Sequence, residues 1–231
     1  MEKIVVLTGA GMSAESGLKT FRDSDGLWEN HRIEDVATPD AWHRNPHLVL
    51  EFYNQRRKQL NSCAPNSAHQ SLVLLEEKYD VQIITQNVDD LHERAGSIKV
   101  IHLHGELFKV RSTLYPELIY DWTDDLNIGE LCQRGGQLRP HIVWFGEEVP
   151  LLERAIEECM TADYCVIIGT SMQVYPAASL IRYVHKGCKI WYIDPKPHIS
   201  HELSLRSKIR IQESSATEGV RVLVAELLGP Q

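Results

Sequence analysis

Six short runs of apolar, mostly β-branched residues recur along the chain and constrain its fold more than any other feature. They are KIVVLTGA from Lys3, VQIITQN from Val81, KVIHLHG from Lys99, YCVIIGTS from Tyr164, KIWYIDP from Lys189 and KIRIQES from Lys208. Segments of helix length separate the runs, and runs that are apolar on both faces are typical of a buried parallel sheet. We therefore predict a doubly wound, Rossmann-like α/β fold with helices on both sides of the sheet.

Three helices and two interruptions complete this outline. The helices are PLLERAIEECMTA from Pro150, PAASLIRYVHKG from Pro176 to Gly187, and ATEGVRVLVAELLG from Ala216 to Gly229. Residues 18–45 are polar and hold no clear strand, so we interpret them as a ligand-covering loop with short helices that also forms part of a small module. Residues 109–139 interrupt the alternation and are expected to form the core of that inserted module, within a single domain over 1–231.

Composition limits the partners and the compartment. The net charge of -8, without any long Lys/Arg run, argues against nucleic acid or an anionic membrane as the main partner. There is no signal-peptide pattern and no apolar run of about 18 residues, so we expect a cytoplasmic protein. The five cysteines show no C-x-x-C spacing, which favours buried free thiols over a disulfide framework or a zinc ribbon.

The sequence GAGMSA at 9–14 fits the G-x-G-x-x-A pattern of dinucleotide-binding turns. Gly9 and Gly11 would let backbone N–H groups approach a phosphate, although a tight turn without a ligand is the alternative. A hydride-transferring Rossmann domain continues with a full helix and a second strand within about 30 residues. Here GLKTFRDSDGLWENH follows, and the next clear strand starts at Val81. The phosphate chemistry is therefore expected without the usual dehydrogenase layout.

Polar side chains follow two further predicted strands. In TQNVDD, Gln86, Asn87 and Asp89 offer amides and a carboxylate that could bind a carboxamide and sugar hydroxyls, or Asp89 or Asp90 could cap the helix DLHERA. In HLHGEL, two histidines alternate along a strand, so both side chains should point to one face. No further ligand stands nearby for a metal.

A single imidazole acting as a general base is the better functional interpretation of this pair. We assign that role to His104, and we expect His102 to be a hydrogen-bonded histidine of the core.

Five motifs in order carry a family resemblance. They are GAGMSAESGLKTFRDSDGLW, TQNVDDLHERAG, HLHGEL, LRPHIVWFGE at 138–147 and GTSMQVYPAA at 169–178. In these motifs the chain resembles the sirtuins, the NAD-consuming protein lysine deacylases, and is most similar to bacterial members of the class that includes desuccinylases. The resemblance implies that NAD is a consumed co-substrate and that acylated lysine side chains of proteins are the partners.

The resemblance also implies roles for individual residues. His104 would be the general base that activates a ribose hydroxyl, with Asn87 as a second catalytic residue, and the products would be free lysine, nicotinamide and O-acyl-ADP-ribose. The residues that would bind NAD are Gly9, Ala10, Gly11, Ser13, Ala14, Gly17, Thr20, Phe21, Arg22, Trp28, Gln86, Asn87, Val88, Asp89, Gly169, Thr170, Ser171, Asp194, Pro195, Lys196 and Ala216.

The substrate peptide would bind at VWFGE through backbone pairing as a strand, a mode that tolerates different sequences. The residues implied there are Val143, Phe145, Gly146, Glu147 and Val174.

The chain departs from the family pattern in two places. Sirtuins commonly carry four zinc-binding cysteines before the LRP segment, whereas only Cys132 lies in this interval. One thiolate cannot make a tetrahedral zinc site. We therefore predict no structural zinc, and a module held by apolar packing of Leu114, Tyr115, Leu118, Ile119, Tyr120, Trp122 and Leu131. The second departure is Asp194, where asparagine is more usual. It could accept both adenine-ribose hydroxyls and favour NAD over NADP, or be a solvated turn residue.

The helix PHLVLEFYNQRRKQL at 46–60 carries a charge within an apolar face. Val49, Phe52, Tyr53, Arg56 and Leu60 share that face. Arg56 could run its stem along the surface with its head in water, as we expect of Arg57 and Lys58. The resemblance favours another role. Tyr53 and Arg56 match the Y-x-x-R pair that acidic-acyl-selective sirtuins use for a succinyl or malonyl carboxylate, with Ala37 leaving the pocket open.

Two other classes of function use the same cofactor pocket. An NAD glycohydrolase or mono-ADP-ribosyltransferase has no use for a peptide-binding strand, and a non-catalytic binder of NAD or ADP-ribose needs no base. The presence of His104 and of VWFGE favours the deacylase.

Overall fold

A six-stranded parallel sheet forms the centre of the larger lobe. The computed structural model describes residues 1–18, 27–28 and 31–229, with only the backbone described at 27–28. The strands lie in the order β11-β10-β9-β1-β4-β5. Their bounds are β1 Lys3–Thr8, β4 Asp80–Thr85, β5 Val100–His102, β9 Tyr164–Ile168, β10 Lys189–Ile193 and β11 Ile209–Gln212. Each predicted run contains one strand, and the strand order places the topological switch point between β1 and β9.

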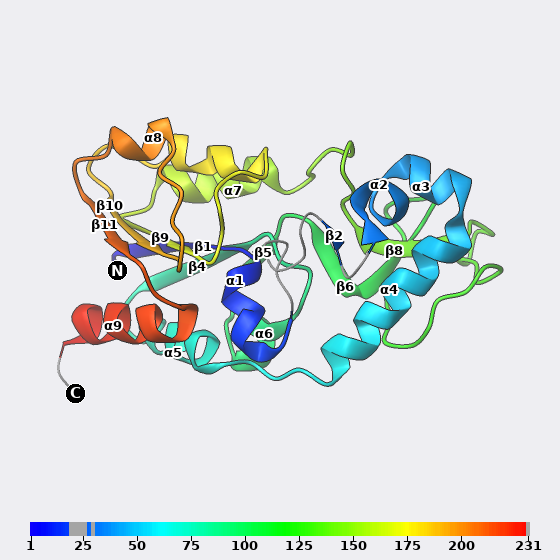
Figure 1. Ribbon diagram of the computed structural model, residues 1–231, viewed down its shortest axis with the longest axis horizontal. Coiled ribbons are helices and arrows are strands. Elements are labelled where there is room, and N and C mark those ends of the chain that lie inside the picture. The colour runs from blue at the N-terminus through cyan, green and yellow to red at the C-terminus, as the bar shows by residue number, and fades with distance from the viewer. Residues whose placement is uncertain (19–26, 29–30, 230–231) are drawn as a thin grey trace.

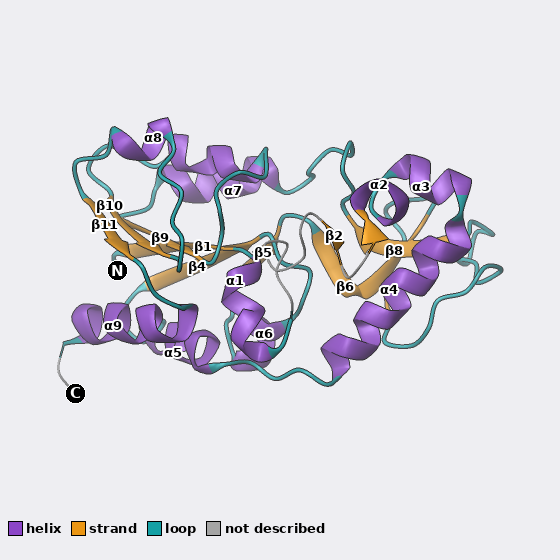
Figure 2. Cartoon of the chain, in the orientation of Figure 1, coloured by secondary structure: helices purple, strands orange, loops and turns teal. Residues whose placement is uncertain are grey.

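Helices cover both faces of this sheet, which confirms the doubly wound fold (Figure 2). On one side lie α5 (Ser67–Leu75) and α9 (Ala216–Leu228), and on the other α7 (Leu152–Met160), α8 (His201–Ser204) and the 3-10 helix η3 (Ala177–Arg182). Strand β1 supplies both cores in alternation. Ile4 and Val6 pack with α5 and α9, while Val5 and Leu7 pack with α7 and η3.

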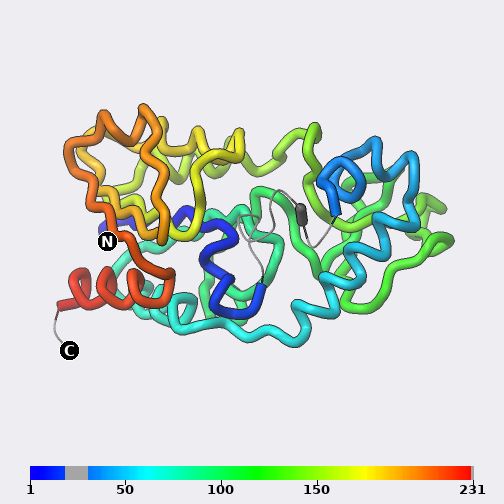
Figure 3. Tube along the Cα trace, in the orientation of Figure 1, coloured from blue at the N-terminus to red at the C-terminus, as the bar shows by residue number. Residues whose placement is uncertain are grey.

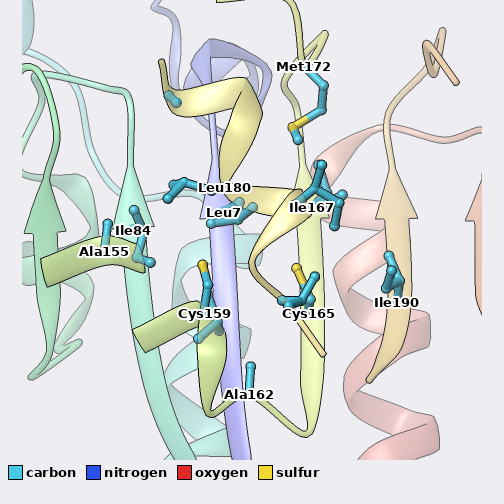
Figure 4. Packing of buried hydrophobic residues seen from close by; sticks show 14 of the residues in the cluster. Leu7, Ile84, Ala155, Cys159, Ala162, Cys165, Ile167, Met172, Leu180 and Ile190 are labelled. Atoms are coloured by element: carbon cyan, nitrogen blue, oxygen red, sulfur yellow. The ribbon is translucent and has the colours of Figure 1, made fainter. Parts of the chain in front are cut away.

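The cysteines are buried thiols, as expected. All five are free and buried. Three of them, Cys159, Cys165 and Cys188, belong to the core between the sheet and α7, and Figure 4 shows Cys159 and Cys165 among aliphatic side chains. Burial raises the pKa of the Cys188 thiol to about 11, so these groups are packing residues at neutral pH.

Two of the three predicted helices have the expected form, and one differs. Helix α9 starts at the predicted Ala216, and α7 starts two residues after Pro150. The segment from Pro176 instead forms η3, which ends at Arg182 rather than near Gly187. Its bonds close over three residues, from Ser179 N to Pro176 O at 2.9 Å and from Tyr183 N to Leu180 O at 3.0 Å, so the α-helical ladder does not form.

A smaller lobe lies at the opposite end of the molecule (Figure 1). It contains an antiparallel sheet in the order β7-β6-β8, with β7 Ile119–Asp121, β6 Gly105–Ser112 and β8 Leu138–Ile142. The helices α2 (Ile33–Val36), α3 (Pro39–Arg44) and α4 (Pro46–Asn61) complete it. Figure 3 shows that two segments distant in sequence meet here, whereas both termini lie in the larger lobe. The sheet extends beyond the predicted 109–139 at both ends.

Short elements fill part of the segment 18–45. β2 (Leu27–Trp28) pairs with β3 (His31–Arg32) as two-residue strands, which no sequence pattern of this length could predict. Helices α2 and α3 follow as the expected short helices. Pro39 occupies the first turn of α3, and the Thr38 side chain caps it by accepting from Ala41 N.

The core of the small lobe is only partly the predicted one. Leu114, Ile119 and Leu131 are 66%, 44% and 55% exposed. The buried cluster is instead Leu50, Val110, Leu126, Cys132 and Leu138, with Tyr115, Leu118, Tyr120 and Trp122 packed against it. Leu50 comes from α4, so this helix covers the small sheet on the side of Tyr120. Ile119, the neighbour of Tyr120 on β7, points to the opposite side and stays in solvent.

Neither a metal-binding cluster nor a membrane-spanning helix is found in the described part of the chain. There, no three His, Cys, Asp or Glu side chains come together in a way that could hold a metal ion. No helix within the described ranges is long and apolar enough to cross a membrane. The absence of structural zinc remains a prediction from the cysteine pattern.

Helix α4 confirms its predicted apolar face and corrects one expectation. Val49, Phe52, Tyr53 and Leu60 are buried. Lys58 is exposed and pairs with Asp125, as expected of a solvated side chain.

Arg57, by contrast, was expected in water and is 1% exposed. Its Nε donates to Leu107 O at 3.0 Å, and its Nη1 donates to Asn54 Oδ1 at 2.7 Å and Asp124 O at 3.2 Å. Main-chain carbonyls from β6 and from the loop that contains Asp124, here called the 124 loop, therefore bind this guanidinium inside the small lobe.

Candidate functional site

Two glycine-containing turns meet at the switch point of the large sheet. Gly9 N donates to Ile168 O at 3.1 Å, and Gly11 N donates to Gly169 O at 2.8 Å. A Cβ on Gly11 would lie 2.6 Å from Gly169 Cα, and Gly169 has a φ of +60°. The N–H groups of Gly9 and Gly11 themselves are thus used within the protein. These glycines allow the turn after β1 to contact the turn after β9 through backbone atoms alone.

A buried polar network joins the first turn to the turn after β4. Asn87 Nδ2 donates to Ser13 Oγ at 3.1 Å, and Ser13 Oγ donates to Asp89 Oδ2 at 3.0 Å. The three residues are 8%, 1% and 6% exposed in that order. Burial raises the pKa of Asp89. A carboxylate this deep needs its donors, so the network fixes the Asn87 amide in one orientation.

Asp89 also takes the alternative role of a helix cap. Its Oδ1 accepts from the backbone N–H of Leu91 at 3.2 Å, at the start of α6 (Leu91–Ala95). Asp90, the other residue considered for the cap, makes no side-chain capping bond and instead pairs with Arg94 at 3.5 Å. Binding and capping are therefore compatible for Asp89, because each of its two oxygens has a separate donor.

Gln86 connects the turn after β4 to the turn after β9. Its Nε2 donates to Thr170 Oγ1 at 3.1 Å, and its backbone N–H donates to Thr8 O at 2.9 Å. Thr170 Oγ1 in turn accepts from Met172 N at 3.2 Å. Turns after three neighbouring strands are thus linked by side chains at the carboxyl edge of the sheet, where open α/β sheets bind ligands.

His104 has the hydrogen bond that a general base requires. Strand β5 ends at His102, so His104 lies in the turn before β6 and the two histidines do not share a strand face, contrary to the expectation. His104 Nδ1 contacts Gln86 O at 3.0 Å. Since a carbonyl oxygen only accepts, Nδ1 carries the proton and Nε2 keeps its lone pair. Burial lowers the pKa of His104, which favours this neutral form at pH 7.

His102 is a buried, hydrogen-bonded histidine, as predicted. Its Nε2 lies 2.7 Å from Glu93 Oε1 and its Nδ1 lies 3.3 Å from Asn87 O. Both partners are acceptors, so the geometry suits the imidazolium, which donates from both nitrogens. Burial alone would lower the pKa of His102, but the hydrogen bond and charge of Glu93 raise it above its ordinary value. His102 therefore stabilises the turn that contains Asn87 through its contact with Asn87 O.

A second group of predicted residues lies on the small-lobe side. Ala37 and Tyr53 are 2% and 0% exposed and belong to one buried cluster with Trp144. Trp144 Nε1 donates to Tyr53 Oη at 3.0 Å. Arg56 lies one helical turn beyond Phe52, half-buried, with its Cζ 5.7 Å from the Phe52 ring centroid. Burial raises the pKa of Tyr53, and the Arg56 charge acts against that rise, so the two side chains are close.

The segment Val143–Glu147 is not an extended strand here. β8 ends at Ile142, and the N–H groups of Val143 and Phe145 donate to His104 O at 2.9 Å and to Ala37 O at 3.0 Å. Pairing with a peptide as an added strand would have to use other backbone groups. The side chains of Phe145 and Val174 are 45% and 38% exposed, so they lie at the surface.

The Glu147 carboxylate is directed into the protein. It accepts from Arg139 at 2.6 Å and 3.1 Å, from Arg111 at 3.1 Å, and from Trp144 N at 2.8 Å. Reasoning from the sequence did not single out Arg139, Arg111 or Trp144. The signal that was available is the arginine in LRPHIVWFGE, a charge within an otherwise apolar run.

Four further residues that the resemblance assigns to NAD lie after β10 and at the start of α9. Asp194 is 2% exposed and accepts from Lys196 N at 2.8 Å, so it is not a solvated turn residue. Pro195 and Lys196 are exposed, and Ala216 is buried at the first position of α9.

Glu15 was missed by sequence reasoning. Its carboxylate accepts from Thr217 N at 3.0 Å and from Thr217 Oγ1 at 2.7 Å. This contact ties the 3-10 helix η1 (Ala14–Ser16), which follows the glycine turn, to α9.

The remaining residues predicted to bind NAD lie partly inside and partly outside the described part of the chain. Ala10 lies in α1 (Ala10–Ser13), Ala14 opens η1, and Gly17 ends it with a φ of +95°. Val88 and Ser171 are half-buried in the turns after β4 and β9. Thr20, Phe21 and Arg22 lie outside the described residues, as does the side chain of Trp28.

Comparison with known proteins agrees with this geometry. Residues 9–176 match the Sir2 family. A Helicobacter pylori protein named NAD-dependent protein deacylase is 55% identical over 228 residues, which is 99% of this chain and 98% of that protein. A mutant Sir2 homologue in complex with ADP-ribose superposes with a TM-score of 0.88 at 40% identity, covering 98% of this chain and 92% of that one. A Sir2 homologue in complex with NAD gives 0.87 at 41% identity, covering 98% and 89%.

Proposed function

The chain belongs to the Sir2 family, and on that premise we propose that it is an NAD-dependent protein lysine deacylase that acts on acetyl groups and on acidic acyl groups such as succinyl and malonyl. Its relatives are named as deacylases, and a Sir2 homologue is described in complex with NAD. The names of these relatives specify neither the acyl groups, nor the roles of individual residues, nor a cytoplasmic location, so these three points are our own proposal.

The residues at the switch point fit NAD. The Gly11 and Gly169 backbones leave no space for a Cβ, and buried Ser13, Asn87 and Asp89 present an ordered set of polar atoms beside them. When bound, NAD supplies the ribose carbon that accepts the acyl oxygen as nicotinamide departs. We assign Gln86, Asn87 and Asp89 to the ribose and carboxamide, and the turns at Gly9 and Gly169 to the rest of the dinucleotide.

The hydrogen bond between His104 Nδ1 and Gln86 O is the observation that carries the catalytic assignment. With Nδ1 bonded to Gln86 O, the Nε2 lone pair is ready to take a proton from a ribose hydroxyl. Because Gln86 itself is held by Thr8 and Thr170, the ring is oriented by the same turn that is assigned to the ribose. A protein that only binds NAD or ADP-ribose would need none of this.

Incubation with NAD, with and without an acylated peptide, tests the reaction class. A deacylase releases nicotinamide in proportion to the peptide consumed. Nicotinamide release at the same rate without peptide would identify an NAD glycohydrolase instead. His104→Asn should stop peptide turnover while NAD still binds, and full turnover by that variant would remove His104 from the catalytic role.

The acidic-acyl assignment rests on Tyr53 and Arg56 on consecutive turns of α4. Tyr53 is fully buried in one cluster with Ala37, which by resemblance to the family would leave the acyl pocket open, and the charge of Arg56 reaches Tyr53. A guanidinium suits a carboxylate through two parallel hydrogen bonds. Charge-assisted bonds of this kind contribute about 1.5–3 kcal/mol, which is about tenfold to a hundredfold in kcat/KM.

Arg56→Met tests that assignment. It should lose most kcat/KM for a succinyl-lysine peptide and little for the acetyl-lysine peptide of the same sequence. Lys58→Met is the matched control, because Lys58 is an exposed cation on the same helix whose partner is Asp125. Equal losses on both peptides in Arg56→Met would mean that Arg56 supports the fold rather than binding the acyl group.

A further inference from the structure

Trp144 connects the segment assigned to the substrate peptide with the residue assigned to the acyl group. It lies two residues after β8, between Val143 and Phe145, and is 2% exposed. Its indole Nε1 donates to Tyr53 Oη at 3.0 Å across the small-lobe core. None of the roles derived above uses this tryptophan.

The direction of this hydrogen bond is fixed by chemistry. An indole nitrogen can only donate, so the Tyr53 oxygen is the acceptor. The Tyr53 hydroxyl proton is therefore not used in the bond with Trp144. Burial raises the pKa of Tyr53, so the hydroxyl keeps that proton at neutral pH. A carboxylate beside Arg56 is an acceptor of the required kind.

An ion pair between buried Arg139 and half-buried Glu147 holds the indole in place. The Arg139 guanidinium lies over the Trp144 ring, with Cζ 3.3 Å from the ring centroid. Glu147 binds both Arg139, at 2.6 Å, and the backbone N–H of Trp144, at 2.8 Å. Burial alone would raise the pKa of Glu147, but the hydrogen bonds from Arg139 outweigh it, so the carboxylate is ionised. Trp42 packs against the same ring at 5.8 Å between centroids.

Given the proposed action on acidic acyl groups, we propose that Trp144, held by Arg139 and Glu147, is a positioning residue that makes Tyr53 a hydrogen-bond donor to the acyl carboxylate. It contributes to selectivity without touching the substrate. Its effect is confined to substrates that bring an acceptor to Tyr53, which an acetyl group does not do. Trp144 and Glu147 lie in the segment assigned to the peptide. A shift of this segment would therefore also move the hydrogen bond from Trp144 to Tyr53 in the acyl pocket.

Trp144→Phe is the central test, since phenylalanine keeps a buried ring and removes only the donor. The measured quantity is the ratio of kcat/KM for succinyl-lysine over acetyl-lysine peptides. Loss of one neutral hydrogen bond should lower this ratio about twofold to tenfold, through a higher KM for the succinyl peptide. An unchanged ratio, or equal losses on both peptides, would overturn the proposal.

A double-mutant cycle shows whether Trp144 acts through Tyr53. If it does, the ratio in Trp144→Phe/Tyr53→Phe is no lower than in Tyr53→Phe alone. A further fall in the double variant would overturn the proposal. If Trp144→Phe does not fold, Arg139→Lys decides, because lysine keeps the charge beside Glu147 but loses the planar stacking on the indole. It should also lower the ratio, and an unchanged ratio counts against the role of Trp144.

The same ratio of kcat/KM values distinguishes failure of the proposed function from failure of the positioning role. A wild-type ratio that Arg56→Met leaves unchanged would overturn the proposed acyl selectivity itself. A ratio that falls in Arg56→Met and in Tyr53→Phe, yet not in Trp144→Phe, would overturn only the positioning role.

Discussion

Replacing Arg57 by methionine should destabilise the small lobe far more than replacing its neighbour Lys58. The Arg57 guanidinium is buried and donates to Leu107 O, Asn54 Oδ1 and Asp124 O. It thereby joins α4 to β6 and to the loop that carries Leu126 into the core. Methionine fills much of the same volume but leaves Leu107 O and Asp124 O without this donor, while Asn54 Oδ1 still accepts from Leu126 N at 2.9 Å.

The magnitude follows from two opposing effects. Each acceptor left unsatisfied costs about 1–3 kcal/mol, which sums to about 2–6 kcal/mol for two. Removing the guanidinium also relieves the cost of burying a charge, and that cost is visible in the pKa of Arg57, which burial lowers to about 10. Breaking a buried charged network by removing one partner usually costs about 3–5 kcal/mol, so we expect about 3 kcal/mol here. In a domain of this size that is a fall in Tm of about 6–12 °C.

Urea unfolding followed by tryptophan fluorescence measures the change, because Trp122 and Trp144 both lie in the small lobe. Lys58→Met removes an exposed pair with Asp125 and should cost no more than about 1 kcal/mol. Hydrogen exchange over β6 and β8 shows whether the lobe opens alone. The reasoning is refuted if Arg57→Met and Lys58→Met have the same free energy of unfolding.

Two further predictions concern the large lobe. Gly169→Ala would place a Cβ 2.3 Å from Met12 N at a φ of +60°, so NAD affinity by calorimetry should fall at least about tenfold; Gly129→Ala, at a φ of +96° with nothing within 4 Å, is the control that should leave NAD affinity unchanged. The His102–Glu93 pair should give pH-dependent stability. The raised pKa of His102 contributes stability that is fully present below its ordinary value of 6.5 and is lost as the pH rises through the folded value. The lowered pKa of Glu93 contributes stability that is present above its ordinary value of 4.5 and is lost as the pH falls. The stability advantage of wild type over His102→Gln should therefore be largest between about pH 4.5 and 6.5, and an advantage that is flat with pH would count against an imidazolium at this position.

Local patterns determined the large sheet, because β1, β4, β9 and β10 are buried along almost their whole length and so carry their own signal. The same reasoning placed α9 and α4 correctly, since proline, serine and asparagine mark where these helices begin. The small-lobe core was predicted less well. Ile119 and Tyr120 are adjacent apolar residues, and only the position of α4 decides that Tyr120 is covered and Ile119 is not.

The sequence by itself determined the motifs at the ends of β1, β4, β5 and β9, because each is a short, continuous string. Tertiary contacts decided which atoms of these motifs remain available to bind a ligand. The N–H groups of Gly9 and Gly11 look free in the sequence, yet they donate to Ile168 O at the end of β9 and to Gly169 O in the turn after it. Arg56 and Arg57 are adjacent and chemically identical, and the carbonyls of β6 and the 124 loop bury one in the small lobe while the other stays half-buried beside Phe52. Hydrogen-bond partners distant in sequence carry no local signal, so only the folded chain could assign these roles.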